Sequence, residues 1–317
     1  MTEKDGTEAT VHIPVLLQEC MDSLNIRPDG IYLDGTLGMG GHSYGIASRL
    51  TTGRLICIDR DETAIERAGR RLAPFWEKTI LVHGNFSESA EILSELGFDR
   101  IDGMLFDLGV SSPQLDESAR GFSYMTDAPL DMRMDKSGGL TAYEVVNFWE
   151  EAELIHILRD YGEERYARRI STAILQAREN KPIETTLELV GIIKSAMPAA
   201  ALREKQHPAK RSFQAIRIAV NDELESIDVM MRTAPDKLRT GGRLCVISFH
   251  SLEDRIVKNA IQARENGCTC PREAPICTCG FKKTLRSITR KPILPGPQEL
   301  ADNPRARSAK LRVAERV

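Results

Sequence analysis

The chain has 317 residues, 41% hydrophobic and 28% charged with a net charge of −3, which is ordinary for a soluble globular protein of about two domains. It is long enough to bury a large core without metals or disulfides. It has no apolar run of the ~18 residues that a membrane span needs, and its first ten residues are acidic, which excludes membrane and secreted proteins and predicts a cytoplasmic one.

The first hundred residues alternate short apolar runs with helical patterns. The runs predict strands at Ile31–Asp34, Arg54–Asp59, Thr79–His83 and Ile101–Asp107, with helices at Glu62–Leu72 and Ser87–Leu96 between them. Strands separated by helices predict βαβ units and a parallel sheet.

That alternation stops near residue 110. Loop-forming residues dominate 111–134, and strand-like alternation returns only at Arg243–Ser248, before a helix at Ser251–Arg264 that Ser251 and Asp254 would cap. Between them we predict helices at Tyr143–Trp149, Glu151–Tyr161, Glu163–Asn180 and Thr186–Ala196. We therefore predict an α/β sheet interrupted by an all-helical insert: 1–115 and 209–317 form the sheet domain, and 116–208 form the insert.

The most informative local motif is the glycine-rich turn 34–42, which follows the first strand and precedes a helix. Glycines allow the backbone to approach a ligand closely, and the helix start offers unpaired N–H groups. Asp59, at the end of the second strand, is placed to accept hydrogen bonds from both ribose hydroxyls of a nucleoside. The alternative is a tight structural turn with a helix-capping Asp. We favour a nucleoside-containing cofactor because both features fall where a doubly wound site requires them.

The turn resembles an S-adenosylmethionine site more than a dinucleotide site, because it opens with Asp34 rather than with the glycine pattern that cradles a pyrophosphate. Phe86, after the third strand, is placed to stack on adenine. The fourth strand ends in Asp107, followed by Ser111, Ser112 and Gln114. These groups suit a polar acceptor that is presented to a methyl donor.

Several motifs resemble those of the bacterial 16S ribosomal RNA cytosine-N4 methyltransferases, and the resemblance runs from about Val11 to the C-terminus. It rests on Ile31–Ser43, Asp107–Asp116, Arg120–Asp135, Tyr161–Arg169, Arg211–Glu225, Ile247–Arg255 and Asn303–Arg316. It implies a Rossmann-like S-adenosylmethionine-dependent methyltransferase with a helical insert. The substrate implied is a decoding-region cytidine of 16S rRNA within the small ribosomal subunit, and we expect a monomer or a weak homodimer. The residues implied to bind the cofactor are Gly40, Gly41, His42, Asp59, Phe86, Asp107 and Gln114, of which His42 and Gln114 come from the resemblance alone.

The chemistry expected is direct methyl transfer to an exocyclic amine whose lone pair is delocalised into the ring. We take Ser111 and Ser112 as candidate catalytic residues that orient this amine near Asp107; the alternative is that the serines only shape the turn before Pro113. Methylation at cytosine C5 would need a cysteine nucleophile near the acceptor loop, and no cysteine lies between Cys57 and Cys245.

The C-terminal segment is basic. Residues 281–317 carry a net charge of +7, which leaves −10 on the rest of the chain. Such a segment is either a phosphate-binding arm or a solvated strand or tail. As candidate RNA contacts we take Arg211, Arg305 and Arg307, because arginine pairs with phosphate oxygens, and His250, which follows the strand that ends at Ser248.

Four of the seven cysteines lie in two Cys-Thr-Cys motifs, the first with Cys268 and Cys270 and the second with Cys277 and Cys279. Four thiols so close in sequence suit a tetrahedral zinc site, although Cys-x-x-Cys is the usual spacing. A structural zinc and a reduced loop without metal both remain open.

Two other function classes also remain. A nicotinamide dehydrogenase would explain the glycine turn and Asp59, but it would leave 107–114 unused. A non-catalytic RNA-binding or assembly factor would explain the basic segment and the insert, but not a complete cofactor site.

Overall fold

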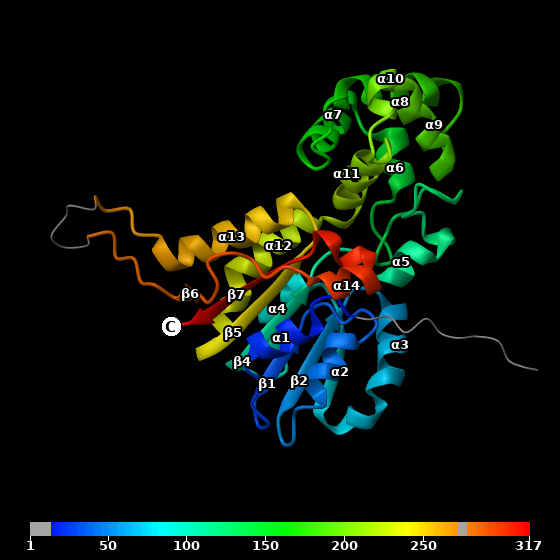
Figure 1. Ribbon diagram of the computed structural model, residues 1–317. Helices are drawn as coiled ribbons and strands as arrows, with labels where there is room; N and C mark the ends of the chain where they lie inside the picture. The colour runs from blue at the N-terminus through cyan, green and yellow to red at the C-terminus, as the bar shows by residue number, and fades with distance from the viewer. Residues whose placement is uncertain (1–13, 272–277) are drawn as a thin grey trace, which may run out of the picture.

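The protein is built on one seven-stranded sheet, with strand order β3-β2-β1-β4-β5-β7-β6 (Figure 1). The computed structural model describes residues 14–271 and 278–317. Strands β1 to β5 run parallel, and β7 lies antiparallel to both β5 and β6. The strands are β1 (Ile31–Asp34), β2 (Arg54–Asp59), β3 (Thr79–His83), β4 (Ile101–Asp107), β5 (Leu238–Ser248), β6 (Leu285–Ser287) and β7 (Lys310–Arg316).

The bounds of β1 to β4 match the four predicted strands. Their side chains are mostly buried because helices cover both faces of this parallel sheet, which is why each strand is a nearly continuous apolar run. Strand β5 begins at Leu238, earlier than predicted. Leu238 pairs with Ile101 of β4, and the register then shifts between Ile101 and Gly103. Regular pairing with β4 starts at Arg243, which is where the sequence pattern predicted the strand to begin.

Helices cover the two faces of the sheet and close two hydrophobic clusters. One face packs against α1 (Leu17–Leu24), α2 (Gly41–Ala47) and α3 (Glu62–Leu72), and the other against α4 (Ser89–Glu95), α12 (Glu223–Thr233) and α13 (Ser251–Asn266). Buried Ala68 and Leu72 of α3 and Met230 of α12 are typical of these faces. The fold is therefore a doubly wound α/β sheet, as predicted, although α1, α11 and α12 were not foreseen.

A third cluster belongs to a helical unit, which we define as α6 to α11 (Figure 1). The unit comprises α6 (Ala142–Phe148), α7 (Glu151–Asp160), α8 (Ala167–Asn180), α9 (Thr186–Ala196), α10 (Ala199–Leu202) and α11 (Lys210–Asn221). Its core extends to Phe213 and Ile216 of α11, past the predicted boundary at 208. Among the described residues, none of the helices is both long and apolar enough to cross a bilayer.

The basic C-terminal segment is built into the sheet. After β6 come α14 (Pro297–Asp302) and the 3₁₀ turn η5 (Pro304–Ser308), and β7 then inserts between β5 and β6. Leu311 and Val313 of β7 are buried, while Arg312 and Lys310 pair with Asp254 at 2.6 and 3.3 Å. A detached phosphate-binding arm at 310–316 is therefore wrong, because these residues form an interior strand of the sheet.

Candidate functional site

The carboxyl ends of β1, β2 and β4 meet at one edge of the sheet. The sheet order places β1 between β2 and β4, and the chain reverses its direction of winding between β1 and β4. Ligands of open α/β sheets bind at this kind of reversal. We call the residues gathered there the strand-end site: Asp34, the glycine turn 35–40, Asp59 and Asp107.

The glycine turn is held between β4 and β2 by its own backbone. Gly35 N donates to Leu105 O and Leu37 N donates to Ile58 O, both at 2.9 Å. Gly40 has φ +70°, and a Cβ there would lie 3.1 Å from the Cβ of Ala68 on α3. Only glycine adopts that conformation without strain while α3 packs so closely. The turn is thus a fixed feature of the fold.

Asp59 holds the turn from the end of β2. Its Oδ2 accepts a hydrogen bond from Gly38 N at 2.7 Å, and its Oδ1 accepts one from Asp61 N at 2.9 Å. Burial raises the pKa of Asp59, and these two N–H donors oppose the shift. Each carboxylate oxygen has a second lone pair, so Asp59 still has acceptor capacity for a ligand hydroxyl.

Two further carboxylates flank the turn. Burial raises the pKa of Asp34 to about 6, although Ser43 Oγ donates to it at 2.6 Å. The pKa of Asp107 rises to about 8 because of burial, and the charges of Asp34 and Glu253 add to the shift. Within residues 14–271 and 278–317, neither lysine nor arginine pairs with Asp34, Asp59 or Asp107.

Asp107 has an unsatisfied oxygen. Its side chain is 25% exposed, yet its Oδ1 is buried without a hydrogen-bond partner. Its backbone N–H donates to Thr36 Oγ1 at 2.6 Å, which ties β4 to the glycine turn. A buried carboxylate oxygen without a donor is costly. A cationic or hydrogen-bond-donating ligand at this point would remove the cost.

His42 links the start of the described chain to this site. Its Nε2 lies 2.9 Å from Val15 O, and its Nδ1 lies 3.7 Å from Asp107 Oδ2. The adjacent Gly41 is buried, and a Cβ there would lie 2.2 Å from Pro14 Cγ. Gly40, Gly41 and His42 therefore form the start of α2, with the segment before α1 packed over them.

Phe86 follows β3 and is partly buried. Its ring meets the ring of Phe106 edge to face, with centroids 6.2 Å apart. Because β3 runs parallel to β2, Phe86 follows the same carboxyl edge of the sheet at which Asp59 lies.

The loop after β4 is anchored by a buried polar network that sequence reasoning missed. Arg120 Nη1 donates to Asp61 Oδ2 at 2.9 Å, and Gln114 Nε2 donates to the same oxygen at 3.2 Å. Gln114 Oε1 accepts from Ser111 N at 3.0 Å. Both polar ends of Gln114 are therefore engaged within the protein. The side chain of Ser112 lies outside the described part of the chain.

His250 caps α13. The predicted cap of Ser251 with Asp254 is wrong: His250 is the N-cap residue and Glu253 is its capping partner, accepting from His250 N at 3.1 Å. Glu253 is fully buried. Although burial pushes the pKa of Glu253 upward, its contacts with His250, 3.1 Å away, and with Phe249 N–H hold it below its usual value.

Arg211 and the start of α13 meet at Glu163, in the turn between α7 and α8. Arg211 Nη1 donates to Glu163 O at 2.9 Å, and Ser251 Oγ donates to Glu163 Oε2 at 2.9 Å. Glu163 thus joins the helical unit to the helix that His250 caps. The tertiary structure brings Arg211 and His250 to one region, although they are distant in sequence.

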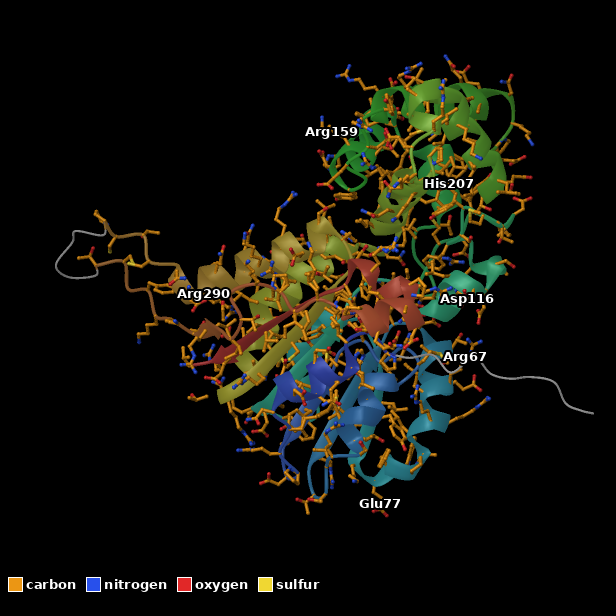
Figure 2. The ribbon with its side chains drawn as sticks, viewed as in Figure 1. Arg67, Glu77, Asp116, Arg159, His207 and Arg290 are labelled. Atoms are coloured by element: carbon orange, nitrogen blue, oxygen red, sulfur yellow. The ribbon has the colours of Figure 1, made fainter. Side chains whose placement is uncertain are left out.

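The two C-terminal arginines differ. Arg305 forms an ion pair with Asp116 of α5 (Ser112–Asp116), with Nη2 2.5 Å from Oδ1. Figure 2 shows Asp116 at the side of the molecule where α5 faces the C-terminal helices. Arg307 is exposed and pairs with no acid among the described residues. Of the two, Arg307 presents the more available charge.

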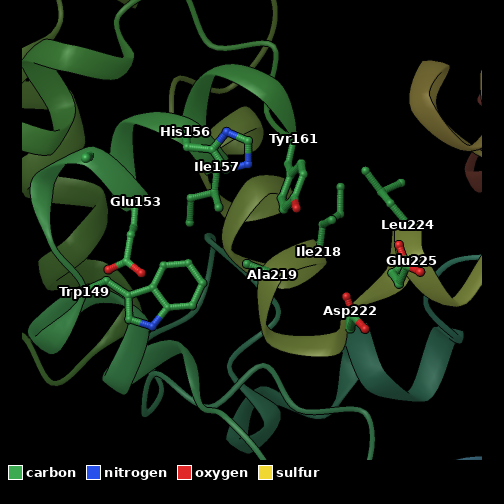
Figure 3. A pocket seen from close by; sticks show the side chains of 11 residues that line it. Trp149, Glu153, His156, Ile157, Tyr161, Ile218, Ala219, Asp222, Leu224 and Glu225 are labelled. Atoms are coloured by element: carbon green, nitrogen blue, oxygen red, sulfur yellow. The ribbon is translucent and has the colours of Figure 1, made fainter.

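A separate cavity of about 480 Å³ lies where the helical unit meets the junction of α11 and α12 (Figure 3). Trp149 and Tyr161 supply aromatic walls, and the carboxylates of Glu153, Asp222 and Glu225 line it. Carboxylates repel phosphate. No predicted site residue is among the described residues that line this cavity, so it is distinct from the strand-end site.

Comparison with known proteins gives consistent matches over almost the whole chain. The model of the MraW methylase family matches residues 9–317. A ribosomal RNA small subunit methyltransferase H of Brevibacillus brevis is 56% identical over 307 residues, covering 96% of this chain and 98% of that protein. The protein of that name from Paenibacillus sp. is 55% identical over 313 residues, covering 96% and 99%. These matches include both parts of the sheet and the helical unit.

Proposed function

The chain belongs to the MraW methylase family, and from that premise we propose that it transfers a methyl group from S-adenosylmethionine to cytosine N4 in small-subunit ribosomal RNA. Its relatives carry the name ribosomal RNA small subunit methyltransferase H. We further propose that the target is a cytidine in the decoding region of 16S rRNA. The substrate would be an assembled small subunit in the cytoplasm, and the enzyme would act as a monomer or a weak homodimer.

The observation that carries the cofactor assignment is the buried, unpartnered Oδ1 of Asp107 within a group of three carboxylates. A sulfonium and an ammonium would bring positive charge to this group, whereas a pyrophosphate would add negative charge. The donor set at the strand-end site therefore fits S-adenosylmethionine better than a nicotinamide dinucleotide. When bound, S-adenosylmethionine supplies an electrophilic methyl group.

We assign the cofactor contacts by position in the strand-end site. Asp59 would accept the ribose hydroxyls, Phe86 would face the adenine, and Asp107 would take the positively charged end. Gly40 and Gly41 would allow close approach at the start of α2, and His42, whose Nδ1 lies 3.7 Å from Asp107 Oδ2, would contact the cofactor beside that carboxylate. Gln114 would contact the cofactor from the loop after β4, where its Oε1 accepts from Ser111 N and its Nε2 donates to Asp61.

The acceptor amine would approach from the loop that follows β4. Ser111 precedes the short helix α5 and Ser112 begins it. We keep their hydroxyls as candidates for orienting the N–H groups of cytosine N4. Asp107 adds an acceptor whose negative charge would favour the positive charge that develops on N4. The proton released afterwards could pass to solvent, because the Asp107 side chain is 25% exposed.

RNA contacts are proposed at Arg211, His250, Arg305 and Arg307. Arg307 is exposed and available at once, whereas Arg305 would have to exchange Asp116 for a phosphate. The target base must leave its stack to reach the methyl donor, which costs least in irregular or single-stranded RNA.

The test is a methyl-transfer assay with labelled S-adenosylmethionine and small ribosomal subunits that lack the modification. The RNA is digested to nucleosides, and we expect the label in N4-methylcytidine. The Asp107→Asn variant should lose most of this label, while Asp29→Ala, at the opposite edge of the sheet, should retain it. Label in another nucleoside, or none with folded protein, would refute the assignment. A protein that binds RNA without transferring label would point to an assembly factor.

A further inference from the structure

The segment between α13 and β6 stands apart from the three hydrophobic clusters. It leaves α13 at Asn266 and reaches β6 at Leu285, and its described parts extend away from the body of the molecule (Figure 1). None of its described residues belongs to a core cluster. A long segment without a core of its own needs another source of order.

The base of this segment is closed by polar contacts. Glu265 accepts hydrogen bonds from Ser287 Oγ at 2.6 Å and from Ser287 N at 3.2 Å. Thr284 N donates to Arg264 O at 3.0 Å. The ring of Phe281 covers Gly267 so closely that a Cβ there would lie 2.7 Å from it. The two ends of the segment are therefore fixed side by side.

Beyond this base, three thiols converge. The sulfur atoms of Cys268, Cys270 and Cys279 all lie within 4.8 Å of one another, and those of Cys268 and Cys279 are 3.6 Å apart. In a tetrahedral zinc site with Zn–S bonds of about 2.3 Å, neighbouring sulfurs are about 3.8 Å apart. The observed spacing is close to that value and much longer than the S–S bond of a disulfide, about 2.05 Å.

The hydrogen bonding around the cluster also suits a metal-bound thiolate. Thr278 N donates to Cys270 Sγ at 3.3 Å, and Thr278 Oγ1 lies 3.7 Å from the same sulfur. Hydrogen bonds of this kind orient and stabilise the ligands of metal sites. Cys20, Cys57 and Cys245 are instead buried in apolar surroundings that raise the pKa of each thiol, as expected of structural core residues.

We propose that Cys268, Cys270 and Cys279 bind one structural zinc ion that closes the segment between α13 and β6. Zinc displaces the thiol protons into solvent, and no oxidant or reductant is required. Three thiolates leave one tetrahedral position for a further thiolate or for water. Cys277, the fourth cysteine of the sequence motif, lies outside the described residues, and the proposal rests on the other three.

The other group of potential ligands does not compete for this role. Glu223, His250 and Glu253 also lie close together, but Arg217 already binds Glu223 through two contacts of 2.8 Å. The Arg217 guanidinium already brings positive charge to Glu223, and carboxylate with imidazole is a less zinc-selective set than three thiolates. Zinc is therefore expected at the cysteines and not beside His250.

The test measures zinc in the full-length protein, purified under reducing conditions, loaded with zinc and then desalted. We expect about one zinc per chain, and close to none when Cys268, Cys270 and Cys279 are replaced together by Ala. Cys245→Ala is the control and should keep the metal, because Cys245 lies in the core of β5. Cobalt in place of zinc should give intense thiolate-to-cobalt charge-transfer absorption in the wild type and lose it in the triple variant.

A second measurement needs no substitution. Chelation of the wild-type protein should expose residues 267–284 to limited proteolysis, and added zinc should restore protection, while the melting temperature of the sheet domain changes little. The proposal is overturned if loaded wild-type protein holds no more zinc than the triple variant. It is equally overturned if thiol counting shows a disulfide between Cys268 and Cys279 in the protein as isolated. Either outcome leaves methyl transfer at the strand-end site unaffected.

Discussion

His42, just after the glycine turn, lies beside Asp107, with His42 Nδ1 3.7 Å from Asp107 Oδ2. The contact joins the first turn of α2 to the end of β4. It leaves the other oxygen of Asp107 buried and without a donor. In the free protein this carboxylate oxygen therefore lacks a compensating donor or positive charge.

The affinity for S-adenosylmethionine should depend on pH through Asp107. The pKa of Asp107 is raised to about 8 by burial, by Asp34 on β1 and by Glu253 on α13; His42 on α2 also faces this carboxylate, with Nδ1 3.7 Å from Oδ2. A cationic ligand favours the carboxylate, so below pH 8 binding requires the loss of a proton. Calorimetry should show affinity that rises from pH 6 to pH 8 and then levels off.

Asp107→Asn is the matched variant for this effect, since the amide keeps the shape and has no charge to titrate. Its affinity should be lower and should vary less with pH than that of the wild type. The pH dependence of stability in the free protein has the opposite sign: stability falls as pH rises, whereas the affinity for the cofactor rises. Ionisation of Asp107 costs stability between the unfolded pKa of ~4 and about 8, so the variant should lose less stability than the wild type as pH rises. If cofactor affinity varied with pH in the same way for both proteins, Asp107 would not be the titrating group at the cofactor site.

Asp59→Ala should weaken binding of S-adenosylmethionine. A charge-assisted hydrogen bond contributes about 1.5–3 kcal/mol, which corresponds to a loss of roughly 10- to 100-fold in affinity. The same substitution removes the acceptor for Gly38 N, so the turn should also loosen. Titration calorimetry measures the affinity, with the exposed Asp29→Ala as the control. Unchanged affinity in a folded variant would show that the ribose binds elsewhere.

Arg120→Ala should destabilise the protein strongly. The side chain is 3% exposed and binds Asp61 as well as the carbonyl oxygens of Arg133 and Met134. Removing one member of a buried pair leaves an uncompensated charge and costs about 3–5 kcal/mol. Denaturant unfolding should reveal this loss, whereas Arg70→Ala, whose partner Glu66 is exposed, should change stability by less than about 1 kcal/mol. Equal effects would contradict an anchoring role for the network.

Leu311→Ala should destabilise the sheet by about 2–5 kcal/mol, because Leu311 of β7 is fully buried. Val317→Ala, at the exposed end of the chain, should have little effect. Deletion of Asn303–Val317 should prevent folding, because it removes the strand between β5 and β6. A soluble, cooperatively folding deletion that loses only RNA affinity at low salt would restore the detached-arm interpretation.

Local patterns in the sequence were sufficient to predict the first four strands of the sheet. Strands β1 to β4 are apolar runs bounded by turn residues, so their limits follow from local composition. The pairing of the glycine turn with Asp59 also follows, because parallel strands present their carboxyl ends at one edge. Helices α11 and α12 were missed, although each buries apolar residues on one face: Phe213 and Ile216 of α11 in the core of the helical unit, and Ile227 and Met230 of α12 against the sheet.

The sequence by itself therefore determined the class of the fold, the position of the glycine turn and the presence of carboxylates at three strand ends, because each depends on neighbours within a few residues. Only the tertiary structure decided which polar groups meet. Gln114 binds Asp61 and Ser111 N, and Arg305 binds Asp116; neither set of partners could be read from the local sequence. Many acids and bases in the chain are locally equivalent, and the choice among them depends on packing between elements that are distant in sequence.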